Sequence, residues 1–356
     1  VDGRPAPGPE ALAEIARLAA EKLPEIALRA RERLAERDPR NLQNLTELRA
    51  LAVRLDQPDI ALAACQTLLQ TQPDHLEGLS GVAELEAAAG RPDAALEAYR
   101  AIARAHPQAT AELRRGLELA RTLNREPAVL EFASAIVAED PEDVTAQVEL
   151  ARARAAAGDS EGALRVYDAL LAAHPGELPY LLEKRQVLSQ RPDPAQLAPV
   201  LDELFRLDPT RTDVAVERGN LYLALAYTQP DGSDERDRSA RNALVAYERA
   251  SSDPAAGAVA ELGIARASRL VGDFDRAVRS YRAFLDRPEN AARHDVLKEL
   301  GHALTETGRY SAARDIYLRA LGGGSEDPEV LWGAVEVLDH LNEDSRALQF
   351  LDVLLG

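Results

Sequence analysis

Hydrophobic residues recur along most of the chain at the three- and four-residue spacing of helices that bury one face. Residues 45–69 show the arrangement, with a first apolar stripe, a short polar turn and a second apolar stripe. The first stripe is Leu45, Leu48, Ala52 and Leu55, and the second is Ala61, Cys65, Leu68 and Leu69. The turn between them is Asp56-Gln57-Pro58-Asp59. This pattern predicts two helices joined by a tight turn.

Prolines mark the places where one helix pair ends and the next begins. Six of them follow one another at a spacing of 34 residues: Pro39, Pro73, Pro107, Pro141, Pro175 and Pro209. Proline lacks an N–H and cannot continue a helix, so it recurs just past a last helical turn. A period of 34 is the length of a two-helix repeat. The spacing therefore predicts an array in which each repeat packs only on its neighbours.

Several stretches frame or interrupt this array. Residues 1–9 are rich in Pro and Gly and are interpreted as a linker, so we expect the repeats to fill residues 10–356. The first helix is expected to bury Leu12, Ile15, Leu18, Ala19 and Leu23. About eleven extra residues fall at 227–238, which we assign to a surface turn inside the seventh repeat. A Gly-rich segment at 322–327 is a second insertion.

Small and aromatic residues at fixed places carry a resemblance to a known family. Alanine is followed four residues later by tyrosine in Ala95/Tyr99, Ala163/Tyr167, Ala243/Tyr247, Ala277/Tyr281 and Ala313/Tyr317. Glycine-type turns occur at Gly158-Asp159, Gly272-Asp273 and Gly308-Arg309, and Leu300-Gly301 matches a first-helix position. In these features the chain resembles the tetratricopeptide repeat (TPR) family over nearly its whole length after residue 9. The resemblance implies an all-α, right-handed superhelical solenoid of about ten helix-turn-helix repeats.

The resemblance also implies where a partner binds. In this family, positions two, five, nine and twelve of each first helix line a concave groove that holds peptides or folded proteins. Transferring this register places Arg114, Glu118, Arg121, Arg152, Asn220, Arg266, Arg269, Lys298 and His302 on the inner face, with Glu77 and Glu84 in the third repeat. Several arginines in an acidic protein would attract an anionic ligand, and the alternative is a solvated face of mixed charge. Only Asn220 fits the family's clamp for chaperone C-termini, so that function is not predicted.

Composition narrows the range of partners. Sixty acidic residues against 42 basic ones give a formal net charge of −18, which disfavours nucleic acid and anionic membrane surfaces as partners. Cys65 is the only cysteine, so neither an internal disulfide nor a cysteine-based metal site is possible. No apolar run has the length of a membrane span. The chain starts at Val1 and contains no Met, so we interpret it as a segment of a longer protein.

Candidate chemistry is sparse. No nucleophile, phosphate-binding or zinc-binding motif is found, and we predict a protein without enzymatic activity and without a cofactor. His302 and Glu306 form an i, i+4 pair typical of a helix surface. The acidic run Asp231, Asp234, Glu235 and Asp237 invites a calcium site. It lacks the ligand order of an EF-hand, so a solvated acidic loop is the other interpretation.

These patterns favour a non-enzymatic scaffold that binds a protein partner in its concave groove. The Ala-, Arg-, Leu- and Pro-rich composition suggests, by analogy, a bacterial envelope protein, including exopolysaccharide-export proteins. That analogy favours an envelope or secretion-complex component as the partner, and the periplasm over the cytoplasm. Two alternatives stay open: a module that contacts polysaccharide in a secretion system, and a regulatory repeat domain fused to an enzyme outside this segment.

Overall fold

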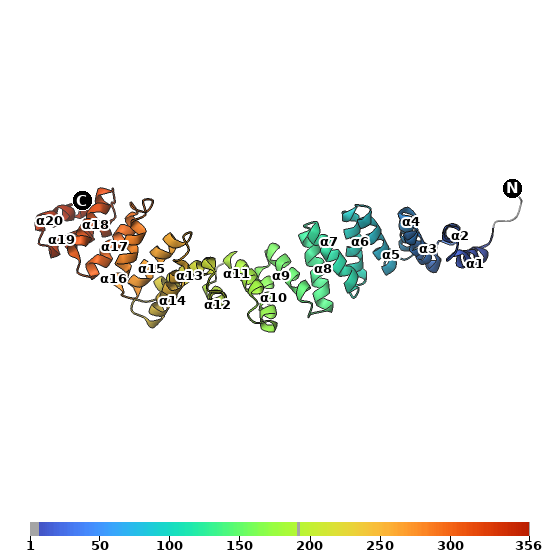
Figure 1. Ribbon diagram of the computed structural model, residues 1–356, viewed down its shortest axis with the longest axis horizontal. Coiled ribbons are helices and arrows are strands. Elements are labelled where there is room, and N and C mark those ends of the chain that lie inside the picture. The colour runs from blue at the N-terminus through green and yellow to red at the C-terminus, as the bar shows by residue number, and fades with distance from the viewer. Residues whose placement is uncertain (1–6, 191–192, 356) are drawn as a thin grey trace. The chain divides into compact units, whose positions relative to one another are not determined.

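The computed structural model describes residues 7–190 and 193–355. These residues form twenty helices and no strand, in two units that divide between Pro175 and Gly176 (Figure 1). The first unit contains α1 (Pro9–Ala19), α2 (Pro24–Arg37), α3 (Leu42–Arg54), α4 (Pro58–Thr71), α5 (Leu76–Ala88), α6 (Pro92–Ala105), α7 (Thr110–Thr122), α8 (Glu126–Glu139), α9 (Val144–Ala156) and α10 (Ser160–Ala173). The second contains α11 (Leu178–Gln190), α12 (Pro194–Leu207), α13 (Thr212–Thr228), α14 (Asp234–Ala250), α15 (Gly257–Leu270), α16 (Phe274–Leu285), α17 (His294–Glu306), α18 (Tyr310–Gly322), α19 (Pro328–His340) and α20 (Asp344–Leu355).

Within each unit the helices pack in chain order, as the sequence pattern predicts. α3 packs against α4, and α4 packs against α5. The first helices of neighbouring pairs also touch, α13 with α15 and α17 with α19, so side chains of successive first helices share one surface. The stripe residues Leu45, Ala52 and Leu68 are buried. Pro73 lies just past the end of α4, where a new pair begins. The all-α repeat fold is confirmed.

In several pairs, the turn between the two helices contains one residue in the left-handed backbone region. Gly158 and Gly272 adopt φ of 83° and 79°, as expected of the predicted glycine turns. Asp56 and Asn124, with φ of 53° and 52°, adopt the same conformation after α3 and α7, where no glycine is present. Asp and Asn are among the residues that tolerate this region best. The turn is therefore retained where the glycine signal is missing.

The tyrosine of a second helix fills the space between two first helices. Tyr247 of α14 is only 1% exposed, and its ring lies against Gly219 of α13 and Gly263 of α15. A Cβ added at these glycines would come within 2.7 Å and 2.4 Å of the ring. Tyr317 lies in the same way between glycines of α17 and α19. The alanine four residues before each tyrosine is fully buried, which lets the helices approach closely. The predicted packing role of the alanine–tyrosine pair is confirmed.

The extra residues at 227–238 do not form the surface turn that the sequence suggested. α13 and α14 each have 17 residues where α3 and α4 have 13 and 14, so only residues 229–233 lie outside helices. The Oγ of Ser233 accepts a hydrogen bond from the N–H of Arg236 at 3.2 Å and caps α14. The acidic residues Asp234, Glu235 and Asp237 occupy the first turn, where negative charge stabilises a helix N-terminus. The acidic run is therefore a helix start.

The N-terminal stretch and the Gly-rich segment were predicted separately from the regular repeats. Of the predicted linker, residues 1–6 lie outside the described residues, and Pro9 begins α1. Leu12 and Ala19 are buried as predicted, but Ile15, Leu18 and Leu23 are exposed, which corrects the predicted stripe. α1 packs chiefly on α2, so only the side that faces α2 is covered. Residues 323–327 of the Gly-rich segment connect α18 to α19.

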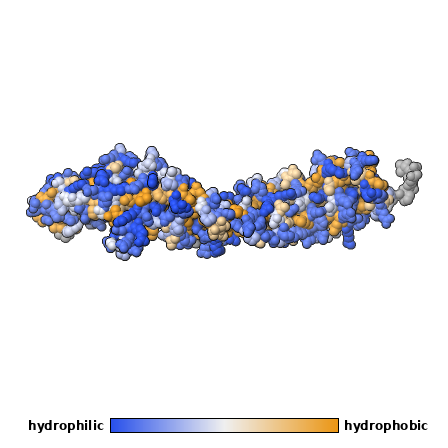
Figure 2. Space-filling model, turned by 60° about the horizontal axis from the view of Figure 1, so that its bottom comes forward, coloured by the Kyte–Doolittle hydropathy of each residue, from blue (hydrophilic) through white to orange (hydrophobic). Residues whose placement is uncertain are grey.

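The surface alternates between apolar and polar regions. On the face shown in Figure 2, hydrophobic patches are separated by hydrophilic surface. Across residues 7–190 and 193–355, no helix combines the length and hydrophobicity of a membrane span.

Candidate partner-binding site

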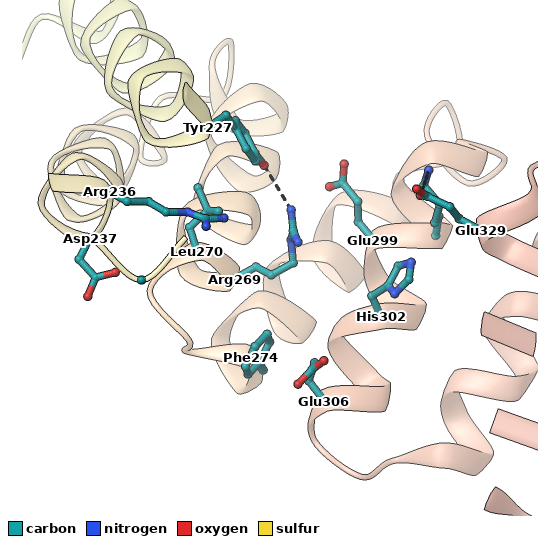
Figure 3. Close-up of a pocket in the computed structure, with 12 residues that line it drawn as sticks. Tyr227, Arg236, Asp237, Arg269, Leu270, Phe274, Glu299, His302, Glu306 and Glu329 are labelled. Atoms are coloured by element: carbon teal, nitrogen blue, oxygen red, sulfur yellow. Dashed lines mark hydrogen bonds and ion pairs between the residues drawn. The ribbon is translucent and has the colours of Figure 1, made fainter. Parts of the chain in front are cut away.

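A cavity of about 610 Å³ lies in the second unit, on the surface shared by successive first helices. We call it the Arg269 cavity. Its lining residues come from α13 to α17 and from α19, so no single helix pair could form it. They are Tyr227, Gly232, Arg236, Asp237, Arg269, Leu270, Phe274, Lys298, Glu299, His302, Glu306 and Glu329 (Figure 3).

One wall of the Arg269 cavity is built by the insertion. Tyr227 belongs to the lengthened end of α13, Gly232 to the short connection, and Arg236 to the first turn of α14. Arg236 is held by an ion pair with Asp231. Figure 3 shows Tyr227 and Arg236 on one side of the cavity, and Glu299 of α17 on the other. The lengthened helices therefore add side chains that a repeat of ordinary length would not provide.

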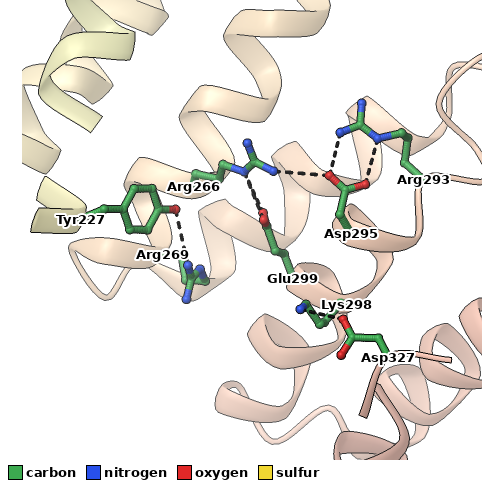
Figure 4. Close-up of polar contacts among 8 residues, drawn as sticks. All are labelled: Tyr227, Arg266, Arg269, Arg293, Asp295, Lys298, Glu299 and Asp327. Carbon is green, nitrogen blue, oxygen red and sulfur yellow. Dashed lines mark hydrogen bonds and ion pairs between the residues drawn. The ribbon is translucent and has the colours of Figure 1, made fainter. Parts of the chain in front are cut away.

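Two cations predicted for the inner face are neutralised within the chain. Arg266 Nε lies 2.9 Å from Glu299 Oε2, and Lys298 Nζ lies 2.8 Å from Asp327 Oδ2 (Figure 4). Lys298 also contacts Glu329 at 2.7 Å. Hydrogen bonds that Lys298 donates to these carboxylates raise the pKa of Lys298. Each pair joins one first helix to the next, so these charges hold neighbouring repeats together as well as lining the surface.

Arg269 differs from these two cations. Among the residues that the structure describes, no carboxylate lies within ion-pair distance of its guanidinium, and its Nε is buried without a hydrogen-bond partner. Its contact is a long hydrogen bond of 3.5 Å from Nη2 to the Tyr227 hydroxyl (Figures 3 and 4). Burial opposes the charge of Arg269, but Tyr281, Tyr227 and Glu299, which lies beyond ion-pair distance, outweigh it and raise the pKa of Arg269. Arg269 is therefore a cation of this cavity that forms no ion pair with the described residues.

The remaining side of the cavity combines apolar and weakly basic groups. Leu270 and Phe274 supply apolar lining. The imidazole of His302 stands edge-on to the Tyr317 ring, with 6.0 Å between ring centres. Desolvation lowers the pKa of His302, so the ring is neutral at pH 7 and adds no positive charge to the cavity.

In the first unit, the predicted residues gather around two adjoining cavities of about 410 and 370 Å³. Arg114 and Arg121 line the first, and Arg121 and Arg152 line the second. Glu118 and Glu149 line both. Arg121 and Arg152 approach Glu149 at 3.5 and 3.0 Å. The charges on this surface are thus mixed and largely paired.

Arginines of α7 in the first unit also form ion pairs with carboxylates of the neighbouring first helices. Arg114 Nη2 lies 2.8 Å from Asp143 Oδ2. Burial acts against ionisation of Asp143, but hydrogen bonds from the Ala146 N–H and from Arg114 outweigh it and lower the pKa of Asp143. Glu84 of the third repeat pairs with Arg115.

Asn220 has a packing contact, and two exposed aromatic residues were missed. Asn220 Oδ1 accepts a hydrogen bond of 2.7 Å from the Tyr247 hydroxyl and does not line the Arg269 cavity. Tyr227 and Trp332 are 48% and 56% exposed. Trp332 lies one turn beyond Glu329 on α19, so it shares the helix face that borders the cavity. Extending the family register by one repeat would have found Trp332, whereas Tyr227 was assigned to the turn.

The acidic insertion is not assembled as a metal centre. Over residues 7–190 and 193–355, no three His, Cys, Asp or Glu side chains gather in a metal-binding arrangement. Asp231 is engaged by Arg236, and Asp234 and Glu235 lie in the first turn of α14.

Comparison with known proteins identifies the family. Its profile, described as tetratricopeptide repeat, matches residues 51–110, 113–177, 262–328 and 298–356. Among solved structures, one of Naa15/Naa10 bound to HypK-THB is 13% identical with a TM-score of 0.45, covering 97% of this chain and 68% of that chain. A tetratricopeptide repeat protein from Parabacteroides merdae ATCC 43184 is 17% identical with a TM-score of 0.35, covering 73% and 98%. MamA is 20% identical with a TM-score of 0.38, covering 49% and 94%. No curated protein sequence matches. Since the family profile covers more than half of the residues, this chain belongs to the tetratricopeptide repeat family.

Proposed function

We propose that this chain is a scaffold that binds a protein partner along the surface formed by successive first helices. Membership of the tetratricopeptide repeat family supports a protein-interaction role in general. The observation that carries the proposal for this surface is the Arg269 cavity, which needs residues from α13 to α17 and from α19. A ligand that fills it contacts several repeats at once, as an extended segment or a protein surface does.

Adjoining hollows suit a partner that presents several side chains in a row. In the first unit, two neighbouring cavities share the side chains of Glu118, Arg121 and Glu149. Charged side chains that already form pairs add little net affinity, but they reject partners with the wrong charge pattern. We therefore assign Arg114, Arg121, Arg152, Arg266 and Lys298 a role in positioning and selectivity. The apolar contacts supply most of the affinity.

The more specific part of the proposal concerns the setting. We propose that the partner belongs to a bacterial envelope assembly, such as an exopolysaccharide-export complex. Its support is the Ala-, Arg-, Leu- and Pro-rich composition together with the long repeat array.

Photo-crosslinking tests the proposed surface. A benzoylphenylalanine replaces Trp332, next to the cavity, and in a second variant it replaces Val245 of α14, which is also exposed and lines none of the three cavities described. In extracts of the source cells, we expect the variant at position 332 to form a discrete cross-linked product, identified by mass spectrometry, and the variant at 245 to form none. Equal products from both variants, or none from 332, would contradict the proposed surface.

Contact with a polysaccharide is a second candidate, favoured by the exposed rings of Tyr227 and Trp332. Aromatic faces bind the apolar faces of sugar rings. Because Trp332 is the only tryptophan, its fluorescence reports such contact without labelling. Titration with dextran and with alginate tests it. A saturable change that is absent in Tyr227→Ala supports sugar binding, and constant fluorescence removes this candidate.

A further inference from the structure

We propose that the Arg269 cavity receives one carboxylate, from an Asp or Glu side chain of the protein partner. This inference rests on the proposed function, because it names the group that the partner presents to this surface. The carboxylate would pair with the Arg269 guanidinium beside the Tyr227 hydroxyl.

The first support is that Arg269 forms no ion pair with the described residues and keeps a buried Nε without a hydrogen-bond partner. Arg266 on the same helix has Glu299 at 2.9 Å, and Lys298 on the next first helix has two acidic neighbours. For Arg269, among the described residues, the contact is the Tyr227 hydroxyl at 3.5 Å, and its Nε is left without a partner. An incoming carboxylate would supply charge-assisted hydrogen bonds to a group that the fold leaves unsatisfied.

The second support is that the cavity wall is specific to this repeat. Tyr227, Gly232 and Arg236 come from the insertion, which lengthens α13 and α14. The Nε of Arg236 is also buried without a hydrogen-bond partner, although the same guanidinium pairs with Asp231. The lengthened helices thus add an aromatic hydroxyl and a second guanidinium to the cavity that Arg269 lines.

The acids around the cavity limit the ligand to a single negative charge. Asp237, Glu299, Glu306 and Glu329 also line it, and the chain as a whole carries −18. A phosphate dianion or a run of acidic residues would be repelled by these carboxylates, whereas one carboxylate gains its pairing with Arg269 at smaller cost. The fitting segment therefore contains one acidic residue among neutral ones.

Apolar side chains in and next to the cavity indicate what flanks the acidic residue. Leu270 and Phe274 line the cavity, and exposed Trp332 lies on the helix face that borders it. Burial of apolar side chains on these groups would supply affinity, and the carboxylate would fix the position of the segment. We infer a segment with aliphatic or aromatic residues next to the Asp or Glu.

Selection of peptides from a random phage-displayed library against the intact chain tests the inference. The strongest peptide is then compared with its Glu→Gln or Asp→Asn version by fluorescence anisotropy, on wild type, Arg269→Gln and Arg279→Gln. Arg279 is exposed on α16 and lines none of the three cavities described, so its variant controls for the loss of one positive charge.

We expect one acidic position to be shared by the selected peptides. Neutralising that residue, or changing Arg269 to Gln, should weaken binding roughly tenfold or more, and combining both changes should cause little further loss. Arg279→Gln should bind as wild type does. The melting temperature of Arg269→Gln should stay within about 2 °C of wild type, because among the described residues the guanidinium forms no ion pair that the substitution would break. This result would separate lost binding from lost folding.

Three results would overturn the assignment. Selected peptides that share no acidic position, or that bind Arg269→Gln and wild type equally, would refute the carboxylate contact and leave the scaffold function intact. A marked drop in the melting temperature of Arg269→Gln would show that Arg269 serves the fold. Selection of no peptide at all would instead count against the proposed protein-binding function.

Discussion

Replacing Gly263 by alanine probes how closely the tyrosine of one pair is held between two first helices. The new methyl carbon would lie 2.4 Å from Tyr247 Cζ and 2.5 Å from Cε2, far inside van der Waals contact. The ring has little room to move away, because Gly219 of α13 lies close to its Cδ1–Cε1 edge, where an added Cβ would come within 2.7 Å of Cε1. The strain must therefore be relieved by a shift of α15 relative to α14.

Two opposing effects set the size of the change in stability. Overpacking of a filled site typically costs about 1–3 kcal/mol. A Gly→Ala change inside a helix returns up to about 1 kcal/mol of helix propensity. We expect the overpacking to dominate, with a net loss of roughly 1–2 kcal/mol. Gly322 of α18 has no atom near its added Cβ, so Gly322→Ala should be neutral or slightly stabilising and serves as the matched control.

A double-mutant cycle with Tyr247→Ala identifies the cause. Truncating Tyr247 alone should cost about 3–5 kcal/mol, as for other large buried rings. In that background Gly263→Ala no longer meets the ring and should become neutral or stabilising. Urea unfolding followed by circular dichroism gives the four free energies. Hydrogen exchange of α15 checks that the loss is local, because repeat arrays need not unfold in two states. An equal effect of Gly263→Ala in both backgrounds would refute the packing described.

Three further predictions concern Cys65, Asp213 and Trp332. Burial raises the pKa of the Cys65 thiol to about 11. Ellman's reagent should therefore fail to react with the native chain at mildly alkaline pH and should react after unfolding. Rapid reaction of the native chain would contradict the burial of Cys65. Burial opposes ionisation of Asp213, but hydrogen bonds from Arg185 and Arg211 outweigh it and lower the pKa of Asp213 to about 2. The wild type should therefore be more stable than Asp213→Asn above about pH 4, and the difference in urea midpoint should vanish as pH falls towards 2, whereas a pH-independent difference would exclude this origin. Trp332→Ala should leave the melting temperature within about 2 °C of wild type, because a half-exposed ring adds little to the core. The same substitution should weaken partner binding. Unchanged binding would show that Trp332 is not part of the contact surface.

The repeat fold could be predicted because its signals are local and recur. Proline stops a helix wherever it stands, and the alanine four residues before Tyr247 needs only helix geometry to lie beside it. The insertion misled for an equally physical reason. Its acidic residues are typical of a solvated loop, but once Ser233 caps α14 the same residues stabilise a helix start.

The candidate site depended on contacts that the sequence does not specify. The register placed Arg266 and Arg269 on one face of α15. It could not indicate that Arg266 meets Glu299, 33 residues later, or that Arg269 meets no acid among the described residues. That difference depends on the side-chain direction and on the approach of α17 to α15. Tyr227 entered the site only because α13 is lengthened, which the period of 34 does not encode.

The central claim is that the first helices bind the partner. Its most direct test is backbone hydrogen exchange of the chain, measured alone and with the partner identified by cross-linking at position 332. We expect slower exchange on partner binding in α15, α17 and α19, and unchanged exchange in α18 and in α16 beyond its first turn, which carries the cavity residue Phe274. Protection confined to α16 and α18, with none in the first helices, would contradict the assignment of this surface.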